Sequence, residues 1–97
     1  MSISLQDSVE VPSTVVSRDL DGETIILSLE TSTYFGLDAV GTRMWTLLKE
    51  HGSLDKVSRL LVQEYDVDPE RLQSDLLELT GRLCDLGLTR VVTRQQA

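Results

Sequence analysis

The first part of the chain alternates hydrophobic and polar residues with the period of β-strands. Residues 14–18 are rich in β-branched side chains, and residues 23–29 are rich in Ile and Leu. The Asp21-Gly22 pair between these segments is typical of a hairpin turn. A second polar reversal precedes residues 33–36, a short aromatic segment. The pattern predicts an antiparallel meander of three strands.

Alternation along the second predicted strand defines two faces. One face carries Ile25, Leu27 and Leu29, and the other carries Thr24, Ile26 and Ser28. Because a strand that covers a core buries its more hydrophobic face, we expect the face with Ile25, Leu27 and Leu29 to pack on the core.

From residue 38 the hydrophobic period changes to that of a helix. Asp38 is placed as the N-cap of a first helix that reaches Gly52, and Ser53 as the N-cap of a second that fades near Tyr65. The Asp68-Pro69 pair is typical of a helix start, so a third helix is expected over residues 69–86. The strands therefore precede the helices, which predicts an α+β fold.

The third predicted helix has a continuous apolar stripe. At about 100° per residue, five leucines fall close to one line along the helix: Leu72, Leu76, Leu79, Leu83 and Leu86. Asp75 and Arg82 border that stripe on one side. The stripe predicts that this helix packs on the core, with charged side chains at the margin of its apolar surface.

The length of 97 residues and the 40% apolar content fit one domain with a single modest core. Residues 1–13 are polar and end near Pro12, and we expect them to form a loosely ordered arm. Residues 88–92 are candidates for a short additional strand, and residues 93–97 form a polar tail.

The formal charge of -7 disfavours nucleic acid and anionic membrane surfaces as partners, because a negative field repels both. The N-terminal residues lack the features of a secretory signal, and no apolar run approaches the roughly 20 residues of a membrane span. Cys84 is the only cysteine, so an internal disulfide is impossible. A cytoplasmic protein is expected.

Reactive side chains do not form a recognisable catalytic or metal-binding pattern. His51, the only histidine, lies at a predicted helix C-terminus, where it is expected to act as a surface cap. Cys84 is far from it in sequence and is expected to be a small buried residue. Asp66 and Asp68 lack the Gly and terminal Glu of a calcium loop. We therefore expect no enzyme activity, no metal and no cofactor.

Binding through an exposed strand is the chemistry that the pattern favours. The predicted strand at residues 33–36 carries no Lys and no Pro, the usual blockers of strand addition. If this strand is an open edge beside the third helix, the two form a groove for an extended peptide. Alternation points only one of Tyr34 and Phe35 toward the core.

Several short segments, taken in order, resemble the PqqD-like family, also called RiPP recognition elements. They are residues 27–30 (LSLE), 34–38 (YFGLD), 41–43 (GTR) with Trp45, and 75–79 (DLLEL) with Leu83, Gly87 and Leu88. The resemblance extends from about Val15 to Val92. It implies a winged-helix-like domain over residues 14–92, with three strands followed by three helices.

The resemblance also implies a function and its site. Members of this family bind the leader segment of a ribosomally made precursor peptide, which adds as a strand and rests on the third helix. A free-standing acidic member is most similar to the recognition protein of a lasso-peptide pathway, whose partners are a leader peptidase and a macrolactam-forming cyclase. By this resemblance the docking strand comprises Ser32, Thr33, Tyr34 and Phe35, and the docking helix presents Leu72, Asp75, Leu76 and Leu79.

A winged-helix DNA-binding regulator, or another protein–protein adaptor, is the alternative interpretation, because the same elements occur in transcription regulators. A DNA-reading helix is expected to carry a basic face. The third predicted helix instead has more acidic than basic residues, which favours peptide recognition.

Overall fold

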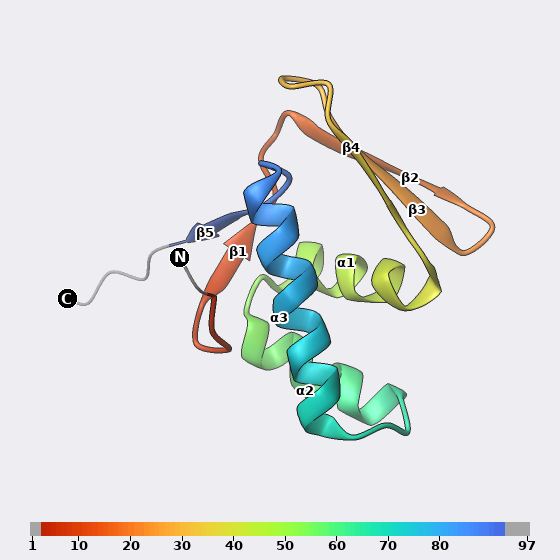
Figure 1. The fold of residues 1–97 in the computed structure, drawn as a ribbon, viewed down its shortest axis with the longest axis vertical. Coiled ribbons are helices and arrows are strands. Elements are labelled where there is room, and N and C mark those ends of the chain that lie inside the picture. The colour runs from red at the N-terminus through yellow and green to blue at the C-terminus, as the bar shows by residue number, and fades with distance from the viewer. Residues whose placement is uncertain (1–2, 93–97) are drawn as a thin grey trace.

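The computed structural model describes residues 3–92, which form an antiparallel three-stranded sheet, three helices and a small second sheet (Figure 1). This arrangement confirms the predicted α+β, winged-helix-like fold. The elements in order are β1 (Ser8–Glu10), β2 (Val15–Leu20), β3 (Glu23–Ser28), β4 (Tyr34–Leu37), α1 (Ala39–His51), α2 (Leu54–Glu64), α3 (Pro69–Asp85) and β5 (Arg90–Val92).

The main sheet has the strand order β2-β3-β4, with antiparallel neighbours. Asp21 and Gly22 join β2 to β3 with φ values of 54° and 84°, the left-handed geometry that a two-residue hairpin turn needs. Ser28 closes the second reversal, since its carbonyl accepts from the Ser32 amide and its own amide donates to the Thr33 carbonyl, both at 2.8 Å. The predicted meander is confirmed.

The predicted core face of β3 is wrong. Thr24, Ile26 and Ser28 face the core and are 1%, 0% and 2% exposed, whereas Ile25 and Leu29 are 44% and 61% exposed. The polar members of the buried face cost little because their hydroxyls are hydrogen-bonded. Thr24 donates to the Asp19 carboxylate at 2.7 Å, and the Ser28 hydroxyl accepts from the Thr31 amide.

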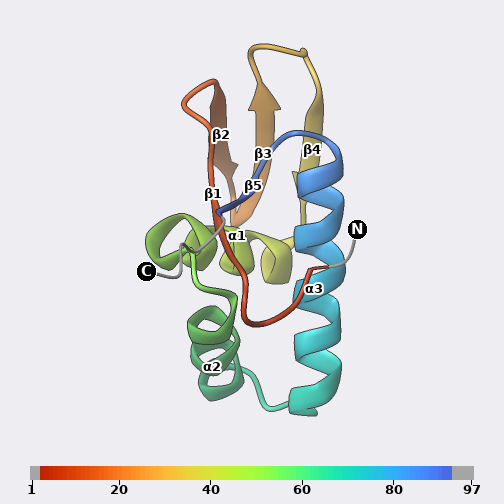
Figure 2. The same cartoon turned by 90° about the vertical axis from the view of Figure 1, so that its left-hand side faces the viewer.

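The three helices begin where their caps predict. The side chains of Asp38, Ser53 and Asp68 accept from the backbone amides of Gly41, Lys56 and Glu70, respectively. Pro69 occupies the first turn of α3. Figure 2 shows the sheet above α1 and α2, with α3 on the same side as β4. Between residues 3 and 92, no helix combines the length and the apolar composition needed to cross a bilayer.

The segment that the sequence predicts to be a loosely ordered arm contains a short strand. Its residues Ser8–Glu10 form β1, which pairs with β5, the short strand expected near the C-terminus. Val9 is 3% exposed, and its amide donates to the Gly52 carbonyl at 3.0 Å. A Cβ at Gly52 would lie 2.9 Å from the Val9 carbonyl oxygen, so the close packing of β1 on α1 requires glycine. The predicted polar tail at residues 93–97 lies outside the described residues.

Two hydrophobic clusters form the core. Trp45, 1% exposed, belongs to the cluster that joins the sheet to α3 through Ile26, Leu37 and Leu83. Leu72 and Leu76 belong to the cluster that α3 shares with α1 and α2. Leu86 departs from the predicted stripe and is 37% exposed, because α3 ends before it.

Candidate functional site

β4 is an edge strand, and its backbone is the first component of the site. Within residues 3–92 it pairs only with β3. The Ser28 amide donates to the Thr33 carbonyl, so these two residues form a hydrogen-bonded pair of the antiparallel ladder. Because such pairs alternate along the strand, Phe35 and Leu37 also direct their N-H and C=O groups toward β3. Tyr34 and Gly36 therefore direct their N-H and C=O groups outward. These four groups are available to a further strand.

A hollow of about 400 Å³ lies beside this edge, between β4, the start of α1 and α3. Phe35 and Leu37 contribute apolar side chains from the strand, and Leu79 contributes one from α3. Asp75 supplies a carboxylate. The lining residues are Phe35, Gly36, Leu37, Asp38, Val40, Gly41, Met44, Asp75 and Leu79.

A second hollow, of about 490 Å³, continues toward the N-terminal end of α3. It shares Val40 and Asp75 with the first hollow, so the two form one depression that we call the β4–α3 groove. The lining residues of the second hollow are Val40, Tyr65, Val67, Asp68, Arg71, Leu72 and Asp75. The lining of the groove is mainly apolar, and its charged side chains are those of Asp38, Asp68, Arg71 and Asp75. An apolar pocket with a few polar groups is typical of binding sites.

The four residues expected in the docking strand occupy different environments. Ser32 lies in the turn before β4, with φ of 59°, and the Thr33 amide is bonded to the Thr31 hydroxyl. Tyr34 begins β4, but its side chain is 74% exposed and lies on the sheet face that points away from the core. Phe35 is half-buried and lines the groove.

The four residues expected in the docking helix also differ in exposure and in position relative to the groove. Asp75 is exposed and Leu79 half-buried, and both line the groove. Leu72 is 5% exposed and lines the second hollow. Leu76 is 0% exposed and belongs to the core cluster, so its side chain supports the groove from below.

Five apolar residues of the groove were not singled out from the sequence as site residues: Leu37, Val40, Met44, Tyr65 and Val67. Leu37 and Met44 are buried, whereas Val40 is 39% exposed and contributes to both hollows. Val67 is 48% exposed in the α2–α3 loop, and Tyr65 lies half-buried beside it. An isolated valine between Asp66 and Asp68 is the sequence signal for this end of the groove, since an apolar residue in a polar loop is exposed unless something covers it.

An ion pair fixes the end of α2 beside the groove. The Arg43 guanidinium donates to both carboxylate oxygens of Glu64, at 2.7 and 2.6 Å. This bidentate bond lowers the pKa of Glu64 below its ordinary value of 4.5 and raises the pKa of Arg43. Tyr65 follows directly, so the pair helps to position one wall of the second hollow.

The side chains that line the groove include no His, Cys or Lys. His51 lies at the end of α1, 3.9 Å from the Glu50 carboxylate, and the Cys84 sulfur lies 3.2 Å from the Thr89 hydroxyl. Across the described part of the chain, no three His, Cys, Asp or Glu side chains gather as they would around a metal ion.

Comparisons with known proteins find the same fold in peptide complexes. The family model of "Coenzyme PQQ synthesis protein D (PqqD)" matches residues 23–88. The chain is similar to the solved structure "TbiB1 in Complex with the TbiA(beta) Leader Peptide", with 34% identity over 90% of this chain and 99% of that chain, at a TM-score of 0.77. A second structure, "Lasso peptide synthetase B1 complexed with the leader peptide", has 18% identity, coverage of 84% and 96%, and a TM-score of 0.75, and it supports the fold alone. No curated protein sequence matches the chain.

Proposed function

This chain belongs to the PqqD family, and we propose that it is a RiPP recognition element, which binds the leader segment of a ribosomally made precursor peptide by strand addition. The family model covers more than half of the chain, and the similarity to a leader-peptide complex extends over nearly all of it. In this proposal the leader pairs with β4 and rests on α3.

The observation that carries the proposal is the unpaired edge of β4 beside the apolar β4–α3 groove. The N-H and C=O groups of Tyr34 and Gly36 offer up to four backbone hydrogen bonds, which bind an extended peptide largely independently of its side chains. Selectivity then comes from the groove. Since side chains of an added strand alternate, every second leader residue faces Phe35, Leu79 and their neighbours.

The proposed site consists of a strand segment and a helix segment. The strand segment is residues 32–36, in which Ser32 and Thr33 shape the turn that presents the edge. The helix segment contributes Leu72, Asp75 and Leu79 to the groove, with Leu76 holding them from below. Asp75 faces a polar or cationic group of the leader at the rim.

The role is one of recognition and delivery without catalysis. The chain holds the precursor for a leader peptidase and a macrolactam-forming cyclase in a lasso-peptide pathway, in the cytoplasm. The similar structure at 34% identity is a complex with a leader peptide, which supports the recognition part of this proposal. The lining of the groove, with apolar side chains and no His, Cys or Lys, fits binding better than chemistry.

Charge argues against the alternative of a DNA-binding regulator. The exposed side chains of α3 include Glu70, Asp75, Glu78 and Asp85 against Arg71 and Arg82, and the whole chain carries -7. A helix that enters a DNA groove needs the opposite balance. Duplex DNA is therefore expected to show no mobility shift with this protein even at low salt.

The direct test begins with a search of the neighbouring genes for a short precursor, whose leader segment is then fluorescently labelled and titrated with this protein by fluorescence anisotropy. Saturable binding is expected, with competition by the unlabelled leader and none by a scrambled peptide of the same composition. Equal binding of the leader and the scrambled peptide would contradict the proposal, because strand addition in a shaped groove depends on the order of side chains.

A further inference from the structure

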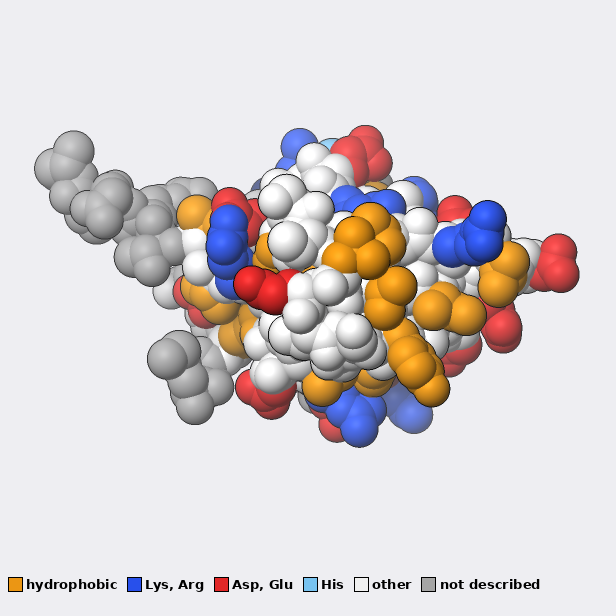
Figure 3. Space-filling model, turned by 90° about the horizontal axis from the view of Figure 1, so that it is seen from above, with side chains coloured by type: hydrophobic (Ala, Val, Ile, Leu, Met, Phe, Trp, Pro, Cys, Tyr) orange, Lys and Arg blue, Asp and Glu red, His pale blue; other side chains and the backbone are white. Residues whose placement is uncertain are grey.

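The main sheet has a hollow on the side opposite the helices, over the end of β4. It measures about 400 Å³ and lies above Gly36, where a Cβ built on the backbone has no atom within 4 Å. We call it the outer hollow. Figure 3, which looks down on this side of the molecule, shows hydrophobic side chains gathered over the sheet. The residues that line the outer hollow are Leu20, Glu23, Thr24, Ile25, Gly36, Leu37 and Asp38.

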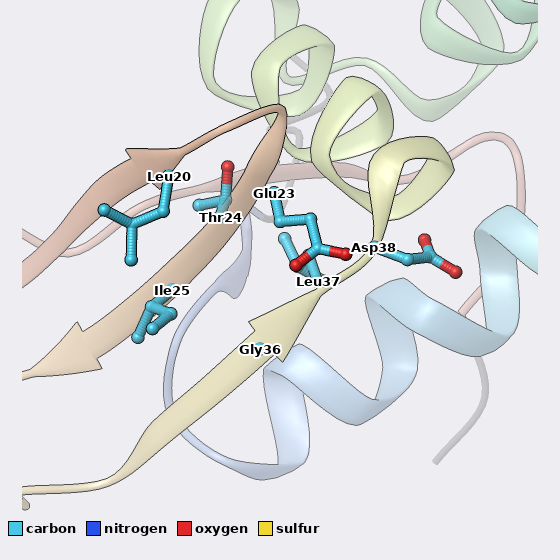
Figure 4. A pocket seen from close by; sticks show the side chains of 7 residues that line it. All are labelled: Leu20, Glu23, Thr24, Ile25, Gly36, Leu37 and Asp38. Carbon is cyan, nitrogen blue, oxygen red and sulfur yellow. The ribbon is translucent and has the colours of Figure 1, made fainter.

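The outer hollow has an apolar wall and an acidic end. Leu20 and Ile25, which are 51% and 44% exposed, form the wall and project to the same side in Figure 4. Glu23 reaches across toward the end of β4, and Asp38 follows directly after that strand. Neither carboxylate forms an ion pair with any residue between 3 and 92. A Lys or Arg side chain fits this chemistry, since its stem is apolar and its head is cationic.

A strand added to β4 would bring side chains to the outer hollow. Tyr34 and Gly36 direct their N-H and C=O groups to the free edge, so an added strand runs directly beside them. Its side chains alternate, and those that do not face the β4–α3 groove lie on the side of the outer hollow. On that side the Tyr34 ring, 74% exposed, occupies its own position, whereas Gly36 leaves its position open. The leader residue next to Gly36 can therefore extend across β4 toward Ile25.

The distance across β4 favours a long side chain. Neighbouring strands lie about 4.8 Å apart, so β3 is roughly 10 Å from a strand added to β4. Glu23 shortens this gap, because its side chain points from β3 toward β4. Lys and Arg combine a long stem with a positive charge. The net charge of -7 also attracts a cationic segment and repels a second copy of this chain.

We propose that the outer hollow is a second specificity site for the leader, which reads a Lys or Arg placed next to Gly36 in the added strand. The inference rests on the function proposed above and deepens it. The stem of the Lys or Arg packs over Gly36 against Ile25, and its head binds the Glu23 carboxylate. Recognition on both sides of the strand fixes the register of the leader, because a shift of one residue would move the cation to the groove side.

The test is a double-mutant cycle between protein and leader. The probe is the labelled leader of a neighbouring precursor, together with peptides in which each Lys or Arg is singly replaced by Gln. Each peptide is titrated by anisotropy against wild type, Glu23→Gln and Asp21→Asn. Asp21→Asn is the matched control: it removes one negative charge from the same hairpin outside the outer hollow, and Asn tolerates the left-handed φ of 54° at this position. Circular dichroism checks that each variant is folded.

The expected result is a coupled loss of affinity. Glu23→Gln should weaken binding of the unmodified leader by roughly three- to tenfold at low salt, and by less at high salt because Glu23 is exposed. One of the Gln-substituted peptides should show a similar loss with wild type and no further loss with Glu23→Gln, since the two changes remove the same contact. Asp21→Asn should bind every peptide nearly as wild type does.

Additive losses for every substituted peptide would overturn the inference, and so would tight binding of a leader that contains no Lys or Arg. Dissociation of a wild-type dimer by Glu23→Gln in sedimentation velocity would also overturn it, since a second copy would then fill the outer hollow. Failure of wild type to bind the leader at all is a different result, because it overturns the proposed function and this inference with it.

Discussion

Replacement of Gly36 by proline tests strand addition most directly, because it changes the free edge and leaves the internal ladder in place. The Gly36 amide points away from β3, so proline removes a donor that β3 does not use. The position tolerates a side chain: a Cβ built there has no atom within 4 Å. Proline is accepted on edge strands in this orientation, and the preceding Phe35 already has the extended backbone that proline favours.

The expected effect follows from the number of groups on the edge. Tyr34 and Gly36 provide two donors and two acceptors, and Gly36→Pro removes one donor and places a ring in the path of the incoming strand. A leader carbonyl that loses its partner at a partly buried contact costs about 1 to 3 kcal/mol. This corresponds to a rise in the leader Kd of about 5- to 150-fold. The melting midpoint should change little, because the bonds from β4 to β3 involve Phe35 and Leu37.

The assay is anisotropy of the labelled leader with wild type, Gly36→Pro and Gly36→Ala. Alanine is the matched control, because it adds a Cβ on the same side but keeps the amide N-H. Gly36→Ala should bind the leader nearly as wild type does. If folded Gly36→Pro and Gly36→Ala bound the leader equally, the leader would not pair with this edge, and the reasoning from the ladder phase would be refuted.

Other substitutions separate the remaining contributions. Asp75→Asn should leave the fold intact and weaken leader binding by about 1 to 3 kcal/mol at low salt, with a smaller loss at high salt because the carboxylate is exposed. Equal affinities at low salt would remove Asp75 from the site. Trp45→Ala should destabilise the protein by about 3 to 5 kcal/mol in chemical denaturation, since the side chain is 1% exposed in the core, and an unchanged midpoint would contradict that burial. The lowered pKa of Glu64 predicts a small stabilisation that is present above its ordinary pKa of 4.5 and is lost as the pH falls through the folded-state pKa. Glu64→Gln should therefore melt slightly below wild type at neutral pH in low salt, with a difference that shrinks as the pH falls below 4.5, and a constant difference would refute the assignment to this pair.

The helices and turns were predictable because their signals are local. A cap, a proline in the first turn or an Asp-Gly turn acts within a few residues, so Asp38, Ser53 and the Asp68-Pro69 pair set the helix starts without knowledge of the rest of the chain. The general position of the candidate groove was also accessible, since an edge strand without Lys or Pro followed by a leucine-rich helix is visible in the sequence.

The buried face of β3 was not predictable in the same way. A shift of one residue in the pairing register exchanges the two faces of the strand. The face that carries Ile26 is buried, although the opposite face has more apolar residues. Side-chain bonds from Thr24 to Asp19 and from Ser28 to the following turn remove the penalty of burying hydroxyls, and sequence alone does not reveal these partners. The separation of Leu76 from Leu79 has a similar origin: both lie on one stripe, but only packing against the neighbouring elements decides which one reaches the groove.

The unexpected orientation of β3 determines which side chains the sheet presents on each side. A sheet that buried Ile25, Leu27 and Leu29 would present Thr24, Ile26 and Ser28 to solvent. Because Ile26 is buried instead, Ile25 and Leu29 remain exposed on the side of the sheet opposite the helices. Along β4 the backbone of Tyr34 and Gly36 faces the free edge, Phe35 faces the groove, and the Tyr34 side chain lies on the opposite side of the sheet. A strand added to β4 would therefore place its side chains alternately in the groove and on that opposite side, so only every second residue of a bound leader would be selected by the groove.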